Sequence, residues 1–157
     1  MTTKFILLIT LLSYSIIVSQ SFMYILALKN VQLTLEANPY TELRKLMDSN
    51  MRSNFKYVIY VALLANLLLL ILNIKNPGSL LFITSTIAFV ALIAEVLLAV
   101  KGNIPINNII NTWTSDNYPT NWTDYRTKWL NVFQYRQIAN LAGFVSLLIG
   151  AVFGTSK

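Results

Sequence analysis

The chain has 157 residues, of which 55% are apolar and only 11% charged, whereas a soluble domain of this size carries roughly 25% charged residues. It has no Cys and no His, and its 12 Lys and Arg residues outnumber its 6 Asp and Glu residues. This composition favours a membrane protein and excludes disulfides, thiol or imidazole catalysis and metal sites built on Cys or His, so we expect no metal and no cofactor.

Four apolar runs are each long enough to cross ~30 Å of hydrocarbon, which takes roughly 17–25 helical residues. They cover residues 5–28, 57–74, 78–100 and 138–154. The first run resembles a signal peptide with a cleavage site at Ser19-Gln20-Ser21, but it continues to Leu28, so we expect an uncleaved helix. The sequence predicts an all-α fold, an integral membrane four-helix bundle that forms one domain over residues 1–157.

The connections between these runs differ in length. Lys75-Asn76-Pro77-Gly78 joins the second and third runs, and Pro-Gly is typical of a tight turn. The other two connections, 29–56 and 102–137, are long, and four spans place both on one side of the membrane. The first of them predicts a short amphipathic helix over about 39–53, which either packs on the bundle or lies in the plane of the lipid headgroups.

The second long connection, 102–137, is predicted to form a cap. It begins with an apolar helical face made of Ile106, Ile109, Ile110 and Trp113. The run 116–119 then breaks the helix, because Asp, Asn and Pro favour turns. No further breaker occurs from Trp122 until Gly143, so we expect one long helix over about 122–153. At ~48 Å it exceeds the bilayer core, and its first turns should protrude above the membrane.

Basic residues are concentrated in the two long connections and the segments beside them. Nine of the twelve lie there, namely Lys29, Arg44, Lys45, Arg52, Lys56, Lys101, Arg126, Lys128 and Arg136. The positive-inside rule places these connections in the cytoplasm, which we expect for a bacterial-type inner membrane; a folded, Trp-rich cap that faces outward is the alternative. The basic residues alternate with acidic ones, so nucleic acid is not an expected partner.

Glu95 is the first candidate for chemistry. It lies six residues before Lys101, ~9 Å inside the end of the third run, where an ionisable group costs several kcal/mol unless it is paired or neutral. Arg136 lies at the matching end of the fourth run, so we expect a Glu95–Arg136 pair. Such a pair either holds two helix ends together or belongs to a site that handles a proton or orients a substrate.

A stripe of aromatic and basic residues on the long helix is the second candidate. Its members follow one another at steps of three and four, and therefore share one face: Trp122, Arg126, Trp129, Phe133, Arg136 and Asn140. Guanidinium groups that alternate with indoles favour stacking and cation–π contacts. The stripe is either a packing seam against the Asn-rich segment or the lid of a pocket for a planar apolar ligand.

Residues 103–136 resemble the signature of the anthrone-oxygenase-like family of small four-helix membrane proteins, most of which are a domain of unknown function. The family pattern reads N-x-P-I-N, a Trp, then W-x3-R-x2-W-x3-H-x2-R. The matching residues here are Asn103, Pro105, Ile106, Asn107, Asn108, Trp113, Trp122, Arg126, Trp129 and Arg136. The resemblance implies a four-helix bundle whose motif segment folds over one end. Some relatives oxidise anthrones to anthraquinones with oxygen, without metal or flavin.

This chain departs from the family pattern where the family has His, because Phe133 occupies that position. Oxygenation without a cofactor needs a base that forms a substrate carbanion, and Phe is not one. We therefore favour a non-catalytic accessory or lipophile-binding protein, with the lipid bilayer, a lipophilic small molecule or another membrane protein as partners. The alternative is a cofactor-independent oxygenase or isomerase acting on a lipophilic aromatic or quinone-like molecule.

In the alternative, Glu95 is the base, and Arg126 and Arg136 stabilise an enolate. The two hypotheses predict different surroundings for the Glu95 carboxylate. A closed apolar cavity that touches Glu95 and Arg136 favours the enzyme, whereas a solid core with a fully paired Glu95 favours the non-catalytic protein.

Overall fold

The computed structural model describes residues 1–154, which form four long helices joined by three short connections. The long helices run from Thr2 to Thr34, from Ala37 to Asn73, from Leu80 to Ile110 and from Trp122 to Phe153. Each is long and apolar enough to cross a membrane. Four candidate spans of this kind indicate a small multi-pass membrane protein.

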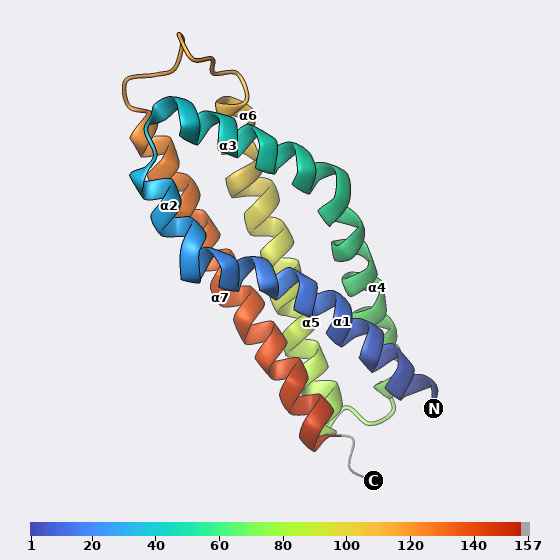
Figure 1. Ribbon diagram of the computed structural model, residues 1–157. Coiled ribbons are helices and arrows are strands. Elements are labelled where there is room, and N and C mark those ends of the chain that lie inside the picture. Colours follow the sequence, from blue (N-terminus) through green and yellow to red (C-terminus); the bar gives the residue numbers. More distant parts are fainter. Residues whose placement is uncertain (155–157) are drawn as a thin grey trace.

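A short π-helical segment interrupts each of the first three long helices, whereas the fourth is continuous. The elements in chain order are α1 (Thr2–Met23), η1 (Tyr24–Leu28), α2 (Lys29–Thr34), α3 (Ala37–Asn50), η2 (Met51–Phe55), α4 (Lys56–Asn73), α5 (Leu80–Leu98), η3 (Ala99–Asn103), α6 (Ile104–Ile110) and α7 (Trp122–Phe153). The N-terminus, the end of α7 and the α4–α5 turn lie at one end of the bundle, and the other two connections lie at the opposite end (Figure 1).

The long helices alternate in direction, and each packs against two others. In the membrane-spanning half, α1 contacts α4 and α7, and α5 also contacts α4 and α7. The shared core contains Tyr14 and Ile17 from α1, Leu69 from α4 and Leu92 from α5, all fully buried. Many Leu, Ile and Val side chains on the outer faces are exposed, as lipid contact requires.

Two glycines allow α7 to pack closely against its neighbours. A Cβ on Gly143 would lie 1.9 Å from the Tyr14 hydroxyl and 2.9 Å from the Ala91 Cβ. A Cβ on Gly150 would lie 2.0 Å from the Thr84 Oγ1. Small residues at such contacts let helix backbones approach within a membrane, so these glycines fix the separation of α7 from α1 and α5.

The predicted helix over 122–153 is confirmed by α7, but the expected long loops are not present. The first connection consists only of residues 35–36, because α2 continues the first span and α3 runs through η2 into α4. The second is 111–121, because α6 continues α5. Hydropathy marks where a helix leaves lipid, not where it ends, so it does not show that the polar helices are continuous with the membrane spans.

The start of α7 is not isolated from the rest of the bundle. The ends of the other three helices surround it, and aromatic side chains fill the space between them. Tyr40 and Trp113 are buried there, and Trp122 and Tyr125 of α7 pack against them. The expected helix over 39–53 is present, but as part of a longer helix.

Candidate functional site

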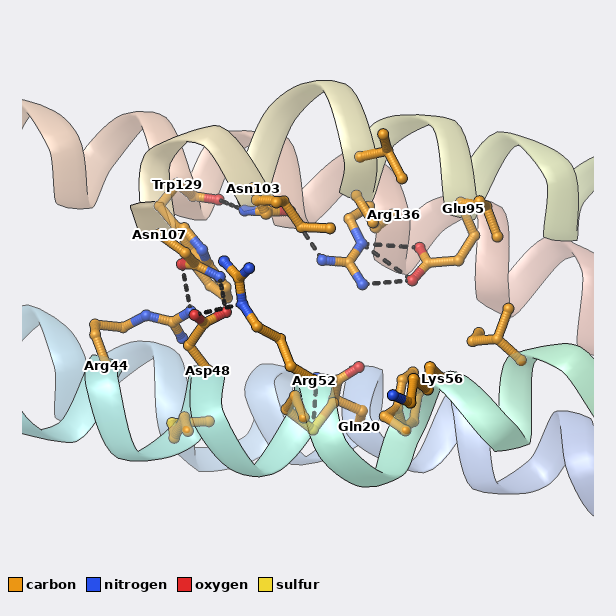
Figure 2. A pocket seen from close by; sticks show the side chains of 18 of the residues that line it. Gln20, Arg44, Asp48, Arg52, Lys56, Glu95, Asn103, Asn107, Trp129 and Arg136 are labelled. Carbon is orange, nitrogen blue, oxygen red and sulfur yellow. Dashed lines mark hydrogen bonds and ion pairs between the residues drawn. The ribbon is translucent and has the colours of Figure 1, made fainter. Parts of the chain in front are cut away.

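A cavity of about 330 Å³ lies where the bundle changes from its apolar half to its polar half. Figure 2 shows α3 and α4 on one side of it and α5 and α6 on the other. Its lining residues are Gln20, Tyr24, Arg44, Met47, Asp48, Met51, Arg52, Phe55, Lys56, Ile59, Tyr60, Glu95, Val96, Ala99, Val100, Asn103, Ile104, Asn107, Trp129 and Arg136. This volume is at the lower end of the range for small-molecule sites, about 300–1,000 Å³.

All three π-helical segments contribute to the cavity wall. Tyr24 comes from η1, Met51 and Phe55 come from η2, and Ala99 and Asn103 come from η3. A π turn bends a helix and often occurs at a functional site. The cavity therefore lies where three of the four long helices have a widened turn.

The wall formed by α3, η2 and α4 consists of two parallel rows. Every fourth residue from Arg44 to Tyr60 lines the cavity, and so does every fourth residue from Met47 to Ile59. In a regular α-helix such a row rotates by about 40° at each step, and the wider turn of η2 reduces this rotation. The π segment thus keeps a mainly polar row and an apolar row on the same face.

The expected Glu95–Arg136 pair is present at one end of the cavity. The Arg136 Nε donates to both Glu95 carboxylate oxygens at 3.0 Å, and Nη2 donates to Oε1 at 2.5 Å. The third nitrogen, Nη1, donates to the Asn103 side-chain oxygen at 2.9 Å (Figure 2). Glu95 is 1% exposed, and both its oxygens already accept hydrogen bonds from the guanidinium group.

Asn103 links this pair to the backbone of α7. Its side-chain nitrogen donates to the Trp129 carbonyl oxygen at 2.9 Å, while its oxygen accepts from Arg136. The asparagine is 1% exposed. It therefore holds η3 against α7 and fixes the position of the Arg136 guanidinium group.

A second polar network lies at the opposite end of the cavity, around Asp48. This carboxylate accepts hydrogen bonds from Arg52 at 2.7 Å, from Asn107 at 2.7 Å and from Asn111 at 2.8 Å. Arg52 also donates to the Asn108 side-chain oxygen at 2.6 Å. The network joins α3 and η2 to α6, and explains three of the asparagines in the predicted cap.

Arg44 lies between this network and the aromatic residues of the cavity. It donates to the Tyr24 hydroxyl at 3.0 Å and to the Asn107 side-chain oxygen at 2.9 Å. Its guanidinium carbon lies 3.7 Å from the centroid of the Trp129 ring. Trp129 in turn stacks on Phe133, with ring centroids 5.0 Å apart, so Phe133 serves as packing where the family pattern has His.

The other residues of the stripe do not line the cavity. Arg126 donates to the carbonyl oxygens of Gln32 and Leu35, both at 3.0 Å, and its guanidinium carbon lies 4.6 Å from the Trp122 ring centroid. It thereby caps the end of α2. Trp113 belongs to the buried aromatic cluster at the polar end. Of the six stripe residues, Trp129 and Arg136 line the cavity.

Sequence reasoning missed Arg44, Asp48, Arg52 and Lys56 as candidate site residues. Their signal was the regular four-residue spacing of charged side chains on and just after the helix expected over 39–53, of which only the apolar face was considered. Among residues 1–154, no group of three or more His, Cys, Asp or Glu side chains is arranged to hold a metal ion.

Comparison with known proteins adds no relative. No family model matches the chain, and neither a curated protein nor a solved structure matches it. The similarity of residues 103–136 to the anthrone-oxygenase-like signature therefore stays a prediction.

Proposed function

We propose that this membrane protein is non-catalytic and binds a lipophilic molecule in the cavity between α3–α4 and α5–α6. The observation that carries the proposal is a cavity with an apolar row on one wall and a Glu95–Arg136 pair whose polar groups already satisfy each other. Apolar walls with a few fixed polar groups are typical of small-molecule sites.

The state of Glu95 argues against catalysis. A general base must accept a proton from its substrate, but both oxygens of this carboxylate accept hydrogen bonds from Arg136. Arg126, the other arginine that the enzyme hypothesis requires, is bonded to backbone carbonyl groups of another helix and does not line the cavity.

Native mass spectrometry of the purified protein in detergent tests the proposal, because it detects a bound lipophile or a partner chain directly. We expect a bound lipophile, and we expect Ala99→Phe to reduce its occupancy because Ala99 lines the cavity. The matched control is Ala142→Phe, at an exposed position of α7 that does not line the cavity. A protein that binds no lipophile, or equal occupancy in both variants, contradicts the proposal.

A cofactor-independent oxygenase is the second candidate, favoured by one observation, that Glu95 and Arg136 both line the cavity. With an anthrone, the ring CH₂ would lose two hydrogens and gain one atom of O₂, and the other atom would leave as water. Oxygen uptake that requires an anthrone and is lost in Glu95→Gln would establish this activity. We expect no such uptake.

A further inference from the structure

The charged side chains of the cavity wall do not balance. Four are cationic, Arg44, Arg52, Lys56 and Arg136, and two are anionic, Asp48 and Glu95. Arg136 pairs with Glu95, and Arg52 pairs with Asp48 at 2.7 Å. Arg44 and Lys56 form an ion pair with no carboxylate of residues 1–154, so the wall carries two positive charges that the described residues leave uncompensated.

Arg44 is the more informative of these two cations because it is only 3% exposed. A buried charge without a counter-charge is costly, and here the nearest compensation is a chain of hydrogen bonds through Asn107 to Asp48. Among residues 1–154, three polar atoms on cavity-lining side chains also lack a hydrogen-bond partner, and two of them are N–H donors: the Nε of Arg44 and the Nε1 of Trp129, beside one acceptor, the Oε1 of Gln20. These features favour an anionic ligand over a neutral one.

The mouth of the cavity shows where the rest of such a ligand would lie. Two lining residues on opposite sides, Tyr60 of α4 and Val100 of η3, are 62% and 53% exposed. Tyr60 lies one turn after Lys56 at the start of the apolar span of α4, and Val100 lies just after the apolar helix α5. The apolar row from Met47 to Ile59 runs from the polar end of the cavity toward this opening.

We infer that the cavity binds an amphiphile with an anionic head group, a carboxylate or a phosphate on a single lipid chain. The head group lies along the cationic row that contains Arg44, Arg52 and Lys56. The chain follows the apolar row and leaves between α4 and η3 into the bilayer, because a cavity of about 330 Å³ holds only part of a lipid. This inference rests on the proposed lipophile site and specifies its ligand class.

Two probes that differ only in the head group test the inference. Monooleoyl glycerol and 1-oleoyl glycerol 3-phosphate have the same chain, but only the second carries a phosphate. Titration of each into the protein in a non-ionic detergent, followed by native mass spectrometry, should show at least tenfold tighter binding of the phosphate. Inorganic phosphate alone is the third probe, and we expect it neither to bind nor to displace the lipid at millimolar concentration.

Lys56→Gln is the decisive variant, because the side chain is exposed and its loss does not disturb the buried networks. We expect it to weaken binding of the phosphate lipid about fivefold, as for one cation near a membrane surface, and to affect binding of the neutral lipid much less. Lys101→Gln is the matched control, since Lys101 is an exposed lysine of η3 that does not line the cavity. It should change neither affinity by more than about twofold.

The possible outcomes separate this inference from the proposed function. Equal binding of the two lipids, or equal effects of Lys56→Gln and Lys101→Gln, would overturn the inference that the head group is anionic. The proposed lipophile site would remain. If inorganic phosphate bound as tightly as the phosphate lipid, the inference of an amphiphile would be overturned, and the ligand would be a free anion. Binding of no probe, together with no effect of Ala99→Phe on occupancy, overturns both proposals.

Discussion

Arg136 holds the Glu95 carboxylate by hydrogen bonds to both of its oxygens, at the level where α5 leaves the apolar half of the bundle. A single unpaired charge is costly at this depth in a membrane, so the two side chains stabilise each other by pairing. The pair joins α5 to α7 at one end of the cavity.

We expect Glu95→Gln to lower the free energy of unfolding by about 3 kcal/mol, because it leaves the Arg136 charge buried and unpaired. Unfolding in mixed detergent micelles, followed by circular dichroism, measures this. The control is Glu42→Gln, at an exposed position of α3, which should cost no more than about 0.5 kcal/mol. Equal losses in the two variants would show that the pair adds nothing to stability.

Arg126→Gln should lower stability by about 1.5–3 kcal/mol and leave lipophile binding unchanged. The guanidinium group holds the Gln32 and Leu35 carbonyl oxygens and lies outside the cavity. Thermal unfolding and native mass spectrometry of the same preparation measure the two effects. Lys128→Gln, at an exposed position of the same helix, is the control. Loss of bound lipophile from folded Arg126→Gln would place this arginine in the site after all.

Gly143→Ala should destabilise the protein even though Ala favours helices by about 1 kcal/mol over Gly. The new methyl group would overlap the buried Tyr14 side chain and the Ala91 Cβ, and overpacking of this kind costs about 1–3 kcal/mol. Adding Tyr14→Phe should recover part of the loss. Gly78→Ala is the control, because no atom lies within 4 Å of its new Cβ. Melting temperatures of the four proteins give the comparison.

Deletion of Ser53 tests whether a π segment forms the cavity. Ser53 is an exposed residue of η2, and removing one residue converts a π turn into an α turn, with both flanking helices in register. We expect helix content by circular dichroism to stay unchanged and bound lipophile to be lost. Ser53→Ala keeps the chain length and should bind as the unaltered protein does. If the deletion variant bound the lipophile as well as the unaltered protein does, the binding site would not depend on the π turn.

The absence of cysteine from the chain permits a direct test of orientation. Nine of twelve basic residues lie on the side of segment 111–121, so the positive-inside rule predicts that this segment is cytoplasmic. An impermeant thiol reagent should then label Gly78→Cys in intact cells and Ser115→Cys only after permeabilisation. The opposite pattern would reverse the orientation.

The four spans were predictable because contact with lipid demands long apolar runs. The Glu95–Arg136 pair was predictable for the same reason, since a charge at that depth needs a partner. Beyond the membrane this constraint ends: the helix that contains Arg44 and Asp48 could be predicted from its apolar spacing, but the partners of these charged side chains could not. Those partners depend on the packing of α3 against α6, which brings Asn107 within hydrogen-bond distance of both side chains.

The π segments could not be predicted from the sequence. Each adds a single residue to a turn, and tertiary contacts decide where it is placed. The packing of Phe133 could not be predicted either, because this ring contacts Trp129 on its own helix and also Tyr24 of another helix, whose ring centroid lies 4.3 Å from that of Phe133.

The two-residue link between α2 and α3 leaves segment 111–121 as the longest non-helical stretch within residues 1–154. Nine of its eleven residues are exposed, and exposed loop tips are the preferred sites of protease cleavage and tolerated insertion. An epitope or a fluorescent domain could therefore be inserted near Ser115 without interrupting a helix. A protease added to the same side should cut first at that point.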